Sequence, residues 1–383
     1  MPKNNNELPA ALGGVPAVTA DQGAANRWPL LTHEDEDAVL EVMRDGNIST
    51  HPVIRELERD YRELTGREYA LAHCNGTAAL LAAFFALDLQ PGDEIIVPAA
   101  TFWASALPML WVGAVPVFCE SEPARLGPDP EDIQRKITPR TRAIVVVHLW
   151  GLPCRMTEIG ELARRHGLRV IEDASHAHGA TWRGRPCGAL GDLSVFSLQG
   201  DKLAPGGEGG ILLGVKTRIA PVSAAIARVQ LKRLPDRNRT RNGNLEYLSR
   251  RLEALGFETF LPPSHIKRTY FEYLVRSDPE RITLPIELLI DALQREGCEI
   301  GAPRYPLLHQ QPFFTEGHYR SVLRCGRNDL PDYGRVRLPA TEEGNARMIK
   351  LPAFPNADHE LLDQYAHAFE KVVNHAHAIR ARA

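Results

Sequence analysis

Short apolar runs alternate with longer amphipathic stretches between residues 69 and 213 of the chain. Runs at residues 94–98, 115–119, 143–149 and 169–173 have the length of strands, and helical spacing dominates between them. Strands that alternate with helices predict an α/β fold with a largely parallel sheet. Because the run at 143–149 is apolar along its length, we expect it in the middle of that sheet.

Amphipathic spacing predicts helices at residues 32–44, 52–65 and 156–166. The first begins with a threonine that can cap it, and acidic residues fill its first turn, where the helix dipole favours them. Gly66 and Gly167 follow the other two helices, and glycine is the usual residue just past a helix end.

The pattern changes after residue 213. Apolar residues at helical spacing, with many arginines between them, predict one long helix at 221–255, which Pro235 is expected to kink. We interpret the charge run at 232–241 as the solvated face of this helix. We expect three parts in the chain: an arm that drapes over something, such as a partner subunit (1–30), a large domain that includes the long helix (31–256), and a smaller α+β domain (257–383).

Composition and charge exclude several classes of function. The 383 residues are 44% hydrophobic and 24% charged, which is ordinary for a globular protein. The formal net charge of -3 provides no basic field for nucleic acid or an anionic membrane. No apolar run approaches the roughly 20 residues of a membrane span, and the polar first residues lack the pattern of a signal peptide. The six cysteines have no metal-binding spacing, so we expect reduced thiols, no metal site and a cytoplasmic location.

A buried helix is expected to begin at the sequence Asn75-Gly76-Thr77, directly after a short strand. The helix is apolar nearly all round. Free backbone N–H groups, the positive end of the helix dipole and the threonine hydroxyl all suit an anion such as phosphate. A plain threonine cap is the alternative for this motif taken alone.

A lone lysine, Lys202, lies in a glycine-rich loop just beyond the apolar run at 195–198. The strand fixes the loop, the glycines let a ligand approach the backbone, and surrounding walls can lower the pKa of the amine. Taken alone, this motif favours a surface lysine in a flexible turn. Residues at other strand ends favour the reactive amine, since Asp173 and Phe102 follow strands and Ser197 lies on one.

Pyridoxal 5′-phosphate requires this combination of residue types. Its aldehyde needs an amine, and its pyridine nitrogen needs a carboxylate that keeps it protonated. The ring also needs a flat face to stack on, and the phosphate needs an anion cradle. Each feature is weak by itself, and together they predict a site for this cofactor.

Five stretches carry a resemblance to the DegT/DnrJ/StrS family of sugar aminotransferases, which have the aspartate-aminotransferase type I fold. The resemblance covers nearly the whole chain and is most specific between residues 170 and 210. The matching stretches are Asn75-Gly-Thr-Ala-Ala-Leu, Val147-His-Leu-Trp-Gly, Glu172-Asp-Ala-Ser-His-Ala-His-Gly-Ala, Gly191-Asp-Leu-Ser-Val-Phe-Ser, and Lys202 followed by Gly207-Glu-Gly-Gly.

The resemblance implies a role for each candidate residue. Lys202 matches the lysine that forms the Schiff base and moves the proton, and Asp173 matches the partner of the pyridine nitrogen. His176 matches a residue, often Gln in relatives, that lies against the ring near its phenolic oxygen. The remaining matches are a stacking aromatic and the phosphate contacts: Phe102, Gly76, Thr77 and Ser197.

The chain departs from the family pattern in two places. Relatives have several dozen residues between the strand that ends near Leu213 and the segment that resembles 214–218, whereas here the two adjoin. Many relatives also carry Asn where Lys216 stands, and that residue reaches the partner subunit's phosphate. A lysine can make the contact as a point charge, so Lys216 is included among the expected cofactor contacts.

The resemblance implies a homodimeric transaminase with active sites at the subunit interface. An amino donor, glutamate or glutamine, would leave pyridoxamine 5′-phosphate, and a keto-sugar or keto-cyclitol would then accept the amine, as in antibiotic or cell-surface sugar biosynthesis. Tyr270, Arg304 and Tyr305 are expected near the substrate. A lyase or aldolase of the same fold, or a non-catalytic regulator that binds the cofactor, is the alternative; Lys202 argues against the dehydratase branch, which has histidine there.

Overall fold

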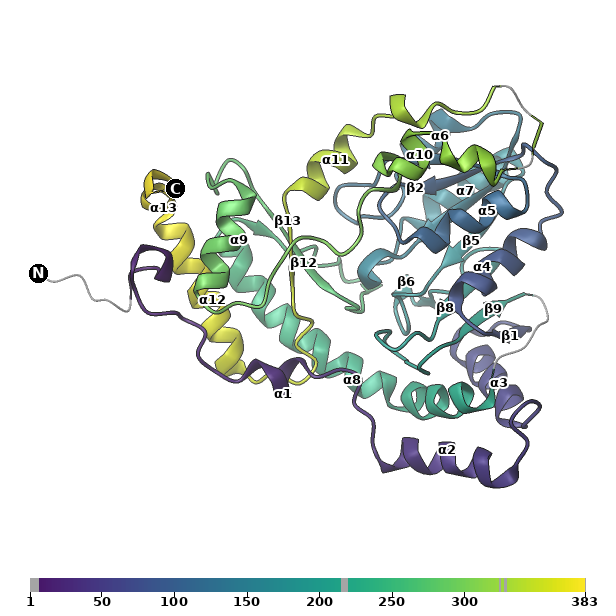
Figure 1. The fold of residues 1–383 in the computed structure, drawn as a ribbon, viewed down its shortest axis with the longest axis horizontal. Coiled ribbons are helices and arrows are strands. Elements are labelled where there is room, and N and C mark those ends of the chain that lie inside the picture. The colour runs from purple at the N-terminus through teal and green to yellow at the C-terminus, as the bar shows by residue number, and fades with distance from the viewer. Residues whose placement is uncertain (1–6, 215–219, 324, 327–328, 383) are drawn as a thin grey trace, which may run out of the picture.

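The computed structural model describes residues 7–214, 220–323, 325–326 and 329–382, and its larger half is built on a seven-stranded sheet (Figure 1). The strand order is β1-β9-β8-β5-β4-β2-β3. Neighbours from β8 to β3 are parallel, whereas β9 runs antiparallel to both β1 and β8. The predicted α/β class with a largely parallel sheet is confirmed. The strands are β1 (Ala70–His73), β2 (Glu94–Pro98), β3 (Val115–Cys119), β4 (Thr141–Val147), β5 (Arg169–Asp173), β8 (Leu193–Ser197) and β9 (Gly210–Leu213).

Helices cover both faces of this sheet because its strands carry apolar side chains on both sides. In β4, Val145 and Val147 face the core beneath α4 and α5, and Ile144 and Val146 face the core beneath α6 and α7. Near β1 and β9, α3 and α8 complete the cover. The helices of this half are α2 (His33–Asp45), α3 (Val53–Thr65), α4 (Gly76–Phe85), α5 (Leu107–Trp111), α6 (Pro130–Lys136), α7 (Met156–His166) and α8 (Pro221–Ala254).

Local signals set the helix ends where the sequence predicts them. Thr32 precedes α2 and forms a capping box with Asp35, which satisfies backbone N–H groups of the first turn. Helices α3 and α7 end at Gly66 and Gly167, which have φ values of 71° and 65°. Only glycine adopts this left-handed conformation without a steric cost, so these predictions are confirmed for a physical reason.

The smaller half contains a three-stranded sheet in the order β10-β12-β13, as expected for an α+β arrangement. The chain between η4 (Leu308–Gln310) and η6 (Tyr333–Arg335) packs back on the larger half, where Phe314 and Tyr333 surround Phe118. The domain division at residue 256 therefore stays a prediction. The elements are β10 (Phe257–Glu258), β12 (Tyr273–Ser277), β13 (Met348–Leu351), α9 (Ile286–Arg295), α10 (Pro312–Thr315), η5 (His318–Ser321), α11 (Pro339–Ala346), α12 (His359–Asn374) and α13 (Ala376–Arg382); β6 (Thr181–Trp182), β7 (Arg185–Pro186) and β11 (Ile266–Lys267) form a third sheet.

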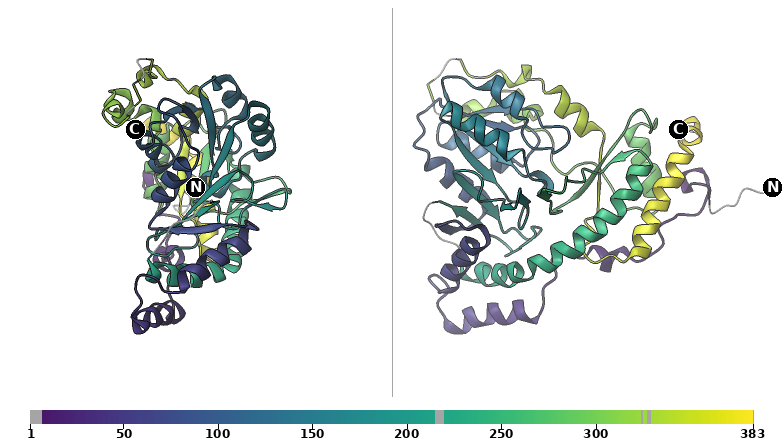
Figure 2. Two further views of the ribbon diagram at one scale, coloured as in Figure 1. Left: turned by 90° about the vertical axis from the view of Figure 1, so that its right-hand side faces the viewer. Right: turned by 180° about the vertical axis from the view of Figure 1, so that it is seen from behind.

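The long helix α8 runs beneath both halves and joins them, with Pro235 in its interior (Figure 2). Our interpretation of the charge run at 232–241 as a solvated face is wrong for its C-terminal part. The Arg241 side chain is only 3% exposed, because Trp28 of the N-terminal arm lies on the helix at this point. The guanidinium groups of Arg237 and Arg241 lie 5.2 and 4.5 Å from the Trp28 ring centroid.

The N-terminal arm lies over the smaller half of its own chain (Figure 1). It includes η1 (Ala10–Leu12) and α1 (Gln22–Asn26). The backbone N–H groups of Ala10 and Ala17 donate to the Glu296 carboxylate, at 2.6 and 2.8 Å. The arm thus drapes over the smaller half of its own chain, whereas the sequence suggested a partner subunit as its support; contact with a partner stays a prediction.

Two further observations bear on the sequence predictions. All six cysteines carry free thiols, as expected. Within the described residues, no helix combines the length and the apolar character that crossing a membrane requires.

Candidate active site

The carboxyl ends of β2, β5 and β8 meet the start of α4 around a cavity of about 540 Å³. Ligands of parallel sheets bind beyond these strand ends. Both halves of the molecule contribute to its walls. The lining residues include Asn75, Gly76, Thr77, Thr101, Phe102, Asp173, His176, Ser197 and Lys202 from the larger half, and Arg304 and Tyr305 from the smaller half.

Lys202 brings a buried amine to this cavity. Its backbone N–H donates to the Gln199 carbonyl at 2.8 Å, which closes the turn after β8. The Nζ atom lies 4.2 Å from the centroid of the Phe271 ring. Burial lowers the pKa of Lys202 to about 8; Asp173 opposes this shift and Arg304 adds to it. A much larger fraction of this amine is therefore neutral near physiological pH than of an exposed lysine.

Asp173 ends β5 with its carboxylate at the cavity. Its Oδ2 accepts a hydrogen bond from the Ser105 hydroxyl at 2.8 Å, and its Oδ1 accepts one from the Ser175 N–H at 3.2 Å. The Ser105 hydroxyl in turn lies 2.8 Å from that of Thr101. These bonds fix the orientation of the carboxylate, which can pair with a positively charged nitrogen.

The start of α4 forms a cradle for an anion. The Asn75 side chain caps the helix by accepting from the Ala78 N–H at 2.8 Å. The N–H groups of Gly76 and Thr77 lie in the first turn, where the helix itself offers no acceptor. A Cβ at Gly76 would lie 3.0 Å from the Ser197 Cβ, and a Cβ at Gly210 would lie 2.4 Å from the Asn75 carbonyl oxygen. The backbone packs this closely only because both positions are glycine.

An aromatic wall lies beside Lys202. The His176 ring stacks on Phe271 at 4.2 Å between centroids and on Trp150 at 5.4 Å. Burial and the positive charge of Lys202 hold the pKa of His176 well below its usual range, so its ring is neutral. Its Nδ1 accepts from the Trp150 N–H at 3.3 Å. Phe102, which is 46% exposed, faces Tyr305 with 5.5 Å between ring centroids.

A fully buried ion cluster lies behind Asp173 and was not predicted from the sequence. The Glu172 carboxylate contacts the His148 Nε2 at 3.0 Å and accepts from the N–H groups of Gly188, Leu190 and Gly191. Burial opposes ionisation, yet His148 and these N–H donors hold the pKa of Glu172 below its usual range. The cluster thereby fixes β5, and with it Asp173, against the loop before β8.

The structure brings together most of the predicted site residues. Lys216 lies outside the described residues, and Tyr270 does not line the cavity, because its ring packs against Arg268 and Tyr273. Arg304 and Tyr305 line the cavity, and their proximity to a substrate stays a prediction. Three residues that orient the others were not predicted from the sequence: Ser105, Trp150 and Phe271. A hydroxyl soon after a strand end was the available signal for Ser105.

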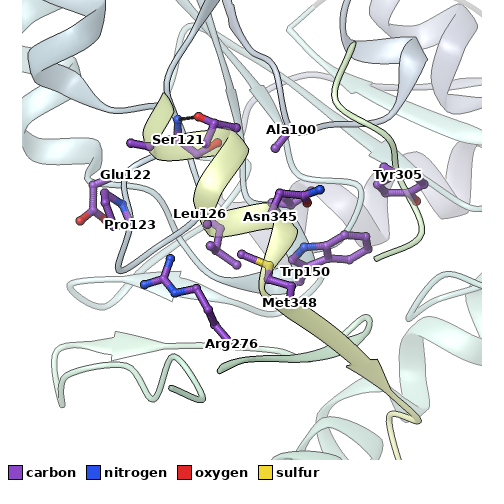
Figure 3. Close-up of a pocket in the computed structure, with 14 residues that line it drawn as sticks. Ala100, Ser121, Glu122, Pro123, Leu126, Trp150, Arg276, Tyr305, Asn345 and Met348 are labelled. Atoms are coloured by element: carbon purple, nitrogen blue, oxygen red, sulfur yellow. Dashed lines mark hydrogen bonds between the residues drawn. The ribbon is translucent and has the colours of Figure 1, made fainter. Parts of the chain in front are cut away.

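A second, much smaller pocket of about 30 Å³ lies behind the aromatic wall (Figure 3). Tyr305 lines both cavities, and Trp150, Leu126 and Met348 line the smaller one. Its volume suits one or two water molecules, so it does not compete with the Lys202 cavity as a substrate site.

The comparisons with known proteins agree with this geometry. The model of the DegT/DnrJ/EryC1/StrS aminotransferase family matches residues 29–213 and 211–370. The two matched ranges meet at residues 211–213, which is where this chain is expected to be shorter than its relatives.

Similar proteins cover most of the chain. The L-glutamine:2-deoxy-scyllo-inosose aminotransferase of Streptomyces lividus is 31% identical over 91% of this chain and 94% of its own length. The GDP-perosamine synthase of Caulobacter vibrioides is 34% identical over 74% of this chain and 85% of its own. The crystal structure of DesI with its TDP-sugar product has a TM-score of 0.81 at 27% identity, and the similarity covers 99% of both chains.

Proposed function

The chain belongs to the DegT/DnrJ/EryC1/StrS aminotransferase family, and we propose that it transfers an amino group from glutamate or glutamine to a keto-sugar or keto-cyclitol with pyridoxal 5′-phosphate as cofactor. The observation that carries this proposal is the buried Lys202 amine in one cavity with the hydrogen-bonded Asp173 carboxylate.

The side chains around the cavity fit this cofactor in charge and shape. Lys202 would hold it through Nζ, and Asp173 would face its ring nitrogen. The start of α4, with Gly76, Thr77 and Ser197, would receive its phosphate. Phe102 and the neutral His176 ring offer flat surfaces for the ring. When bound, the protonated ring withdraws electrons from the substrate carbon and so makes its proton removable.

Lys202, Asp173 and the aromatic wall would each have a different role in the reaction. The neutral form of Lys202 accepts a proton at Nζ and its charged form donates one, and a pKa of about 8 makes both forms available near neutral pH. Asp173 would present its carboxylate to the ring nitrogen in a fixed orientation, because Ser105 and Ser175 donate to its two oxygens. The aromatic wall of Trp150, Phe271 and His176 keeps bulk water away from Lys202.

The acceptor class rests on the relatives, whose names specify an inosose and nucleotide-linked sugars. A cavity of about 540 Å³ has room for a ring-sized acceptor beside the cofactor. We further infer a homodimer with active sites at its interface and a place in antibiotic or cell-surface sugar biosynthesis. The free thiols support a reducing, cytoplasmic compartment.

The test is covalent capture followed by turnover. Purified protein incubated with pyridoxal phosphate and reduced with borohydride should carry the cofactor's mass on the peptide that contains Lys202, and Lys202→Ala should carry none. Addition of glutamine or glutamate should convert the bound cofactor to its amine form, and keto-cyclitols or keto-sugars, tested singly, should reverse the absorbance change.

Each alternative function gives a different result in this experiment. A lyase or aldolase captures the cofactor but cleaves substrate without exchanging the amine, and a regulator captures it without turnover. Protein that takes up no cofactor, or attaches it elsewhere than Lys202, would contradict the proposal.

A further inference from the structure

The buried arginine of α8 lacks an acidic partner among the described residues. Arg241 is 3% exposed, and its Nη1 donates to the Tyr270 carbonyl at 3.2 Å, while its Nε has no acceptor. Its pKa is lowered to about 10, first by burial and then by the charge of Arg237. A guanidinium is seldom buried without a carboxylate or a comparable anion, because the charge loses its hydration.

Arg241 lines a cavity of about 220 Å³ between the N-terminal arm and the smaller half. Trp28, Asp201, Glu272, Arg304 and Lys350 also line it. Arg304 donates to Glu272 at 2.5 Å and to Asp201 at 3.2 Å, and the Lys350 amine lies 3.8 Å from Glu272. The two carboxylates are therefore matched by other cations, and the positive charge of Arg241 remains in excess.

This cavity adjoins the Lys202 site. Arg304 lines both cavities, and the Phe271 ring lines this one while it packs against the Lys202 amine. The Arg241 guanidinium lies over the Trp28 ring, and the Trp28 Nε1 donates to the Lys202 backbone carbonyl at 3.1 Å. One side chain of the arm thus positions the arginine relative to the loop that carries the reactive amine.

We propose that Arg241 binds the carboxylate of the amino donor, so that the cavity beside Trp28 is the donor's carboxylate subsite. The inference rests on the proposed transaminase function. Both candidate donors, glutamate and glutamine, carry an α-carboxylate, whereas a cyclitol or free-sugar acceptor is neutral. A guanidinium presents its N–H groups in a plane that matches the two oxygens of a carboxylate.

The experiment measures the two half-reactions separately by stopped-flow absorbance in the holoenzyme. The variants are Arg241→Met and Arg241→Lys. Arg237→Met is the matched control, because Arg237 lies over the same Trp28 ring and bonds to the Leu30 carbonyl but does not line the cavity. The amino-cyclitol or amino-sugar product serves as an amine donor without a carboxylate.

For Arg241→Met we expect kcat/KM for glutamine and glutamate to fall about 10- to 100-fold, the effect of one charge-assisted hydrogen-bonding partner. The half-reaction with the carboxylate-free amine should keep the wild-type rate. In Arg241→Lys, kcat/KM for glutamine and glutamate should fall less. In Arg237→Met, kcat/KM should stay unchanged in both half-reactions.

Other outcomes overturn the proposal. If kcat/KM falls equally in both half-reactions, Arg241 stabilises the fold. If kcat/KM falls only for a nucleotide-linked substrate, the anion that Arg241 binds is a phosphate of the acceptor. An acid of a partner subunit paired with Arg241 in a crystal structure would also overturn it. If Arg241→Met does not fold, inhibition by glutarate decides: it should weaken severalfold in Arg241→Lys, and an unchanged inhibition constant contradicts the proposal. Wild-type enzyme that exchanges no amine would instead contradict the transaminase function.

Discussion

At the scale of single residues, the cavity holds two groups with different proposed roles, the Asp173 carboxylate and the Lys202 amine. Hydroxyl and N–H groups that donate to the Asp173 carboxylate fix its orientation, whereas burial drives the Lys202 amine toward its neutral form. An amine with a lowered pKa in one cavity with a carboxylate is typical of catalytic centres. Ser105, which bonds to the carboxylate, and Phe271, which packs against the amine, come from separate parts of the chain, so these partners could not be predicted from the sequence.

Asp173→Asn tests the charge at the ring nitrogen. Asn keeps an oxygen for the Ser105 hydroxyl but carries no charge, so the cofactor should remain bound while turnover falls about 100-fold or more, as for the loss of one preorganised electrostatic group. Absorbance gives the cofactor content and steady-state kinetics gives kcat. Ser105→Ala, which leaves the charge in place, should cost less than about tenfold. Wild-type turnover in Asp173→Asn would contradict the assigned role.

The lowered pKa of Lys202 predicts the pH dependence of cofactor capture. In the cofactor-free protein the amine is protonated below pH 8 and neutral above it, and only the neutral amine attacks the aldehyde. The capture rate should rise up to about pH 8 and then level off. Arg304→Met removes a positive charge that lowers this pKa, so its midpoint should move upward. The measurement is the absorbance change after cofactor addition from pH 6.5 to 9.5. A midpoint near that of a free lysine would refute the buried amine.

At the scale of elements, the start of α4 and the strand β9 form the cradle proposed for the phosphate through close backbone contact. The sequence predicted the helix start from Gly76–Thr77, because that signal is local. It did not predict that β9 runs antiparallel between β1 and β8, because strand direction depends on partners far away in the chain. The contact of Gly210 with Asn75 follows from that pairing.

Gly210→Ala should therefore disturb the cradle. Its Cβ would lie 2.4 Å from the Asn75 carbonyl oxygen, so the strand or the helix start must shift. We expect at least tenfold weaker affinity for pyridoxal phosphate and a lower melting temperature. Gly243→Ala is the control: a Cβ there meets nothing within 4 Å in the interior of α8, so it should stabilise the protein by about 0.5–1 kcal/mol. Equal effects of the two substitutions would show that backbone contact at Gly210 is unimportant.

The buried cluster behind β5 predicts how stability depends on pH. Because the folded-state pKa of Glu172 is below its unfolded value, the stability that it contributes is present above about pH 4.5 and is lost as the pH falls. Glu172→Gln should cost about 3 kcal/mol or more at pH 7, since it leaves His148 and several N–H groups without their charged acceptor. Urea unfolding at pH 7 and pH 4 measures this. The difference in the free energy of unfolding between variant and wild type should be smaller at pH 4 than at pH 7. An equal difference at both pH values would contradict an ionised Glu172 carboxylate.

At the scale of the whole molecule, the order of strands and helices was predictable and the contacts between distant segments were not. Helices such as α7 have their signals, spacing and a terminal glycine, within a few turns. The burial of Arg241 depends instead on Trp28, which reaches it only after the arm has crossed the smaller half. A charge run on a helix carries no information about which part of it another segment will cover, and that is why the solvated-face interpretation failed.

The proposed dimer can be tested on the apolar surface that the single chain leaves exposed. Phe85 at the end of α4 and Trp111 at the end of α5 are 79% and 62% exposed, and Phe102, at the mouth of the Lys202 cavity, is 46% exposed. Because α4 and α5 pack side by side, Phe85 and Trp111 lie on neighbouring helices, and α4 begins at the Lys202 cavity with Gly76. Large exposed rings of this kind mark protein interfaces.

The double substitution Phe85→Glu and Trp111→Glu should therefore separate the subunits. Light scattering should give about twice 42.5 kDa for the wild type and a single chain mass for the variant. Activity should fall with the dimer, because the proposed active sites lie at the interface. Val15→Glu is the control: it adds a charge at a 51% exposed apolar residue on the arm, away from α4 and α5, and should leave the mass unchanged. A variant that remains dimeric would place the interface on another face, and a wild type that is monomeric and active would show that one chain completes the site alone.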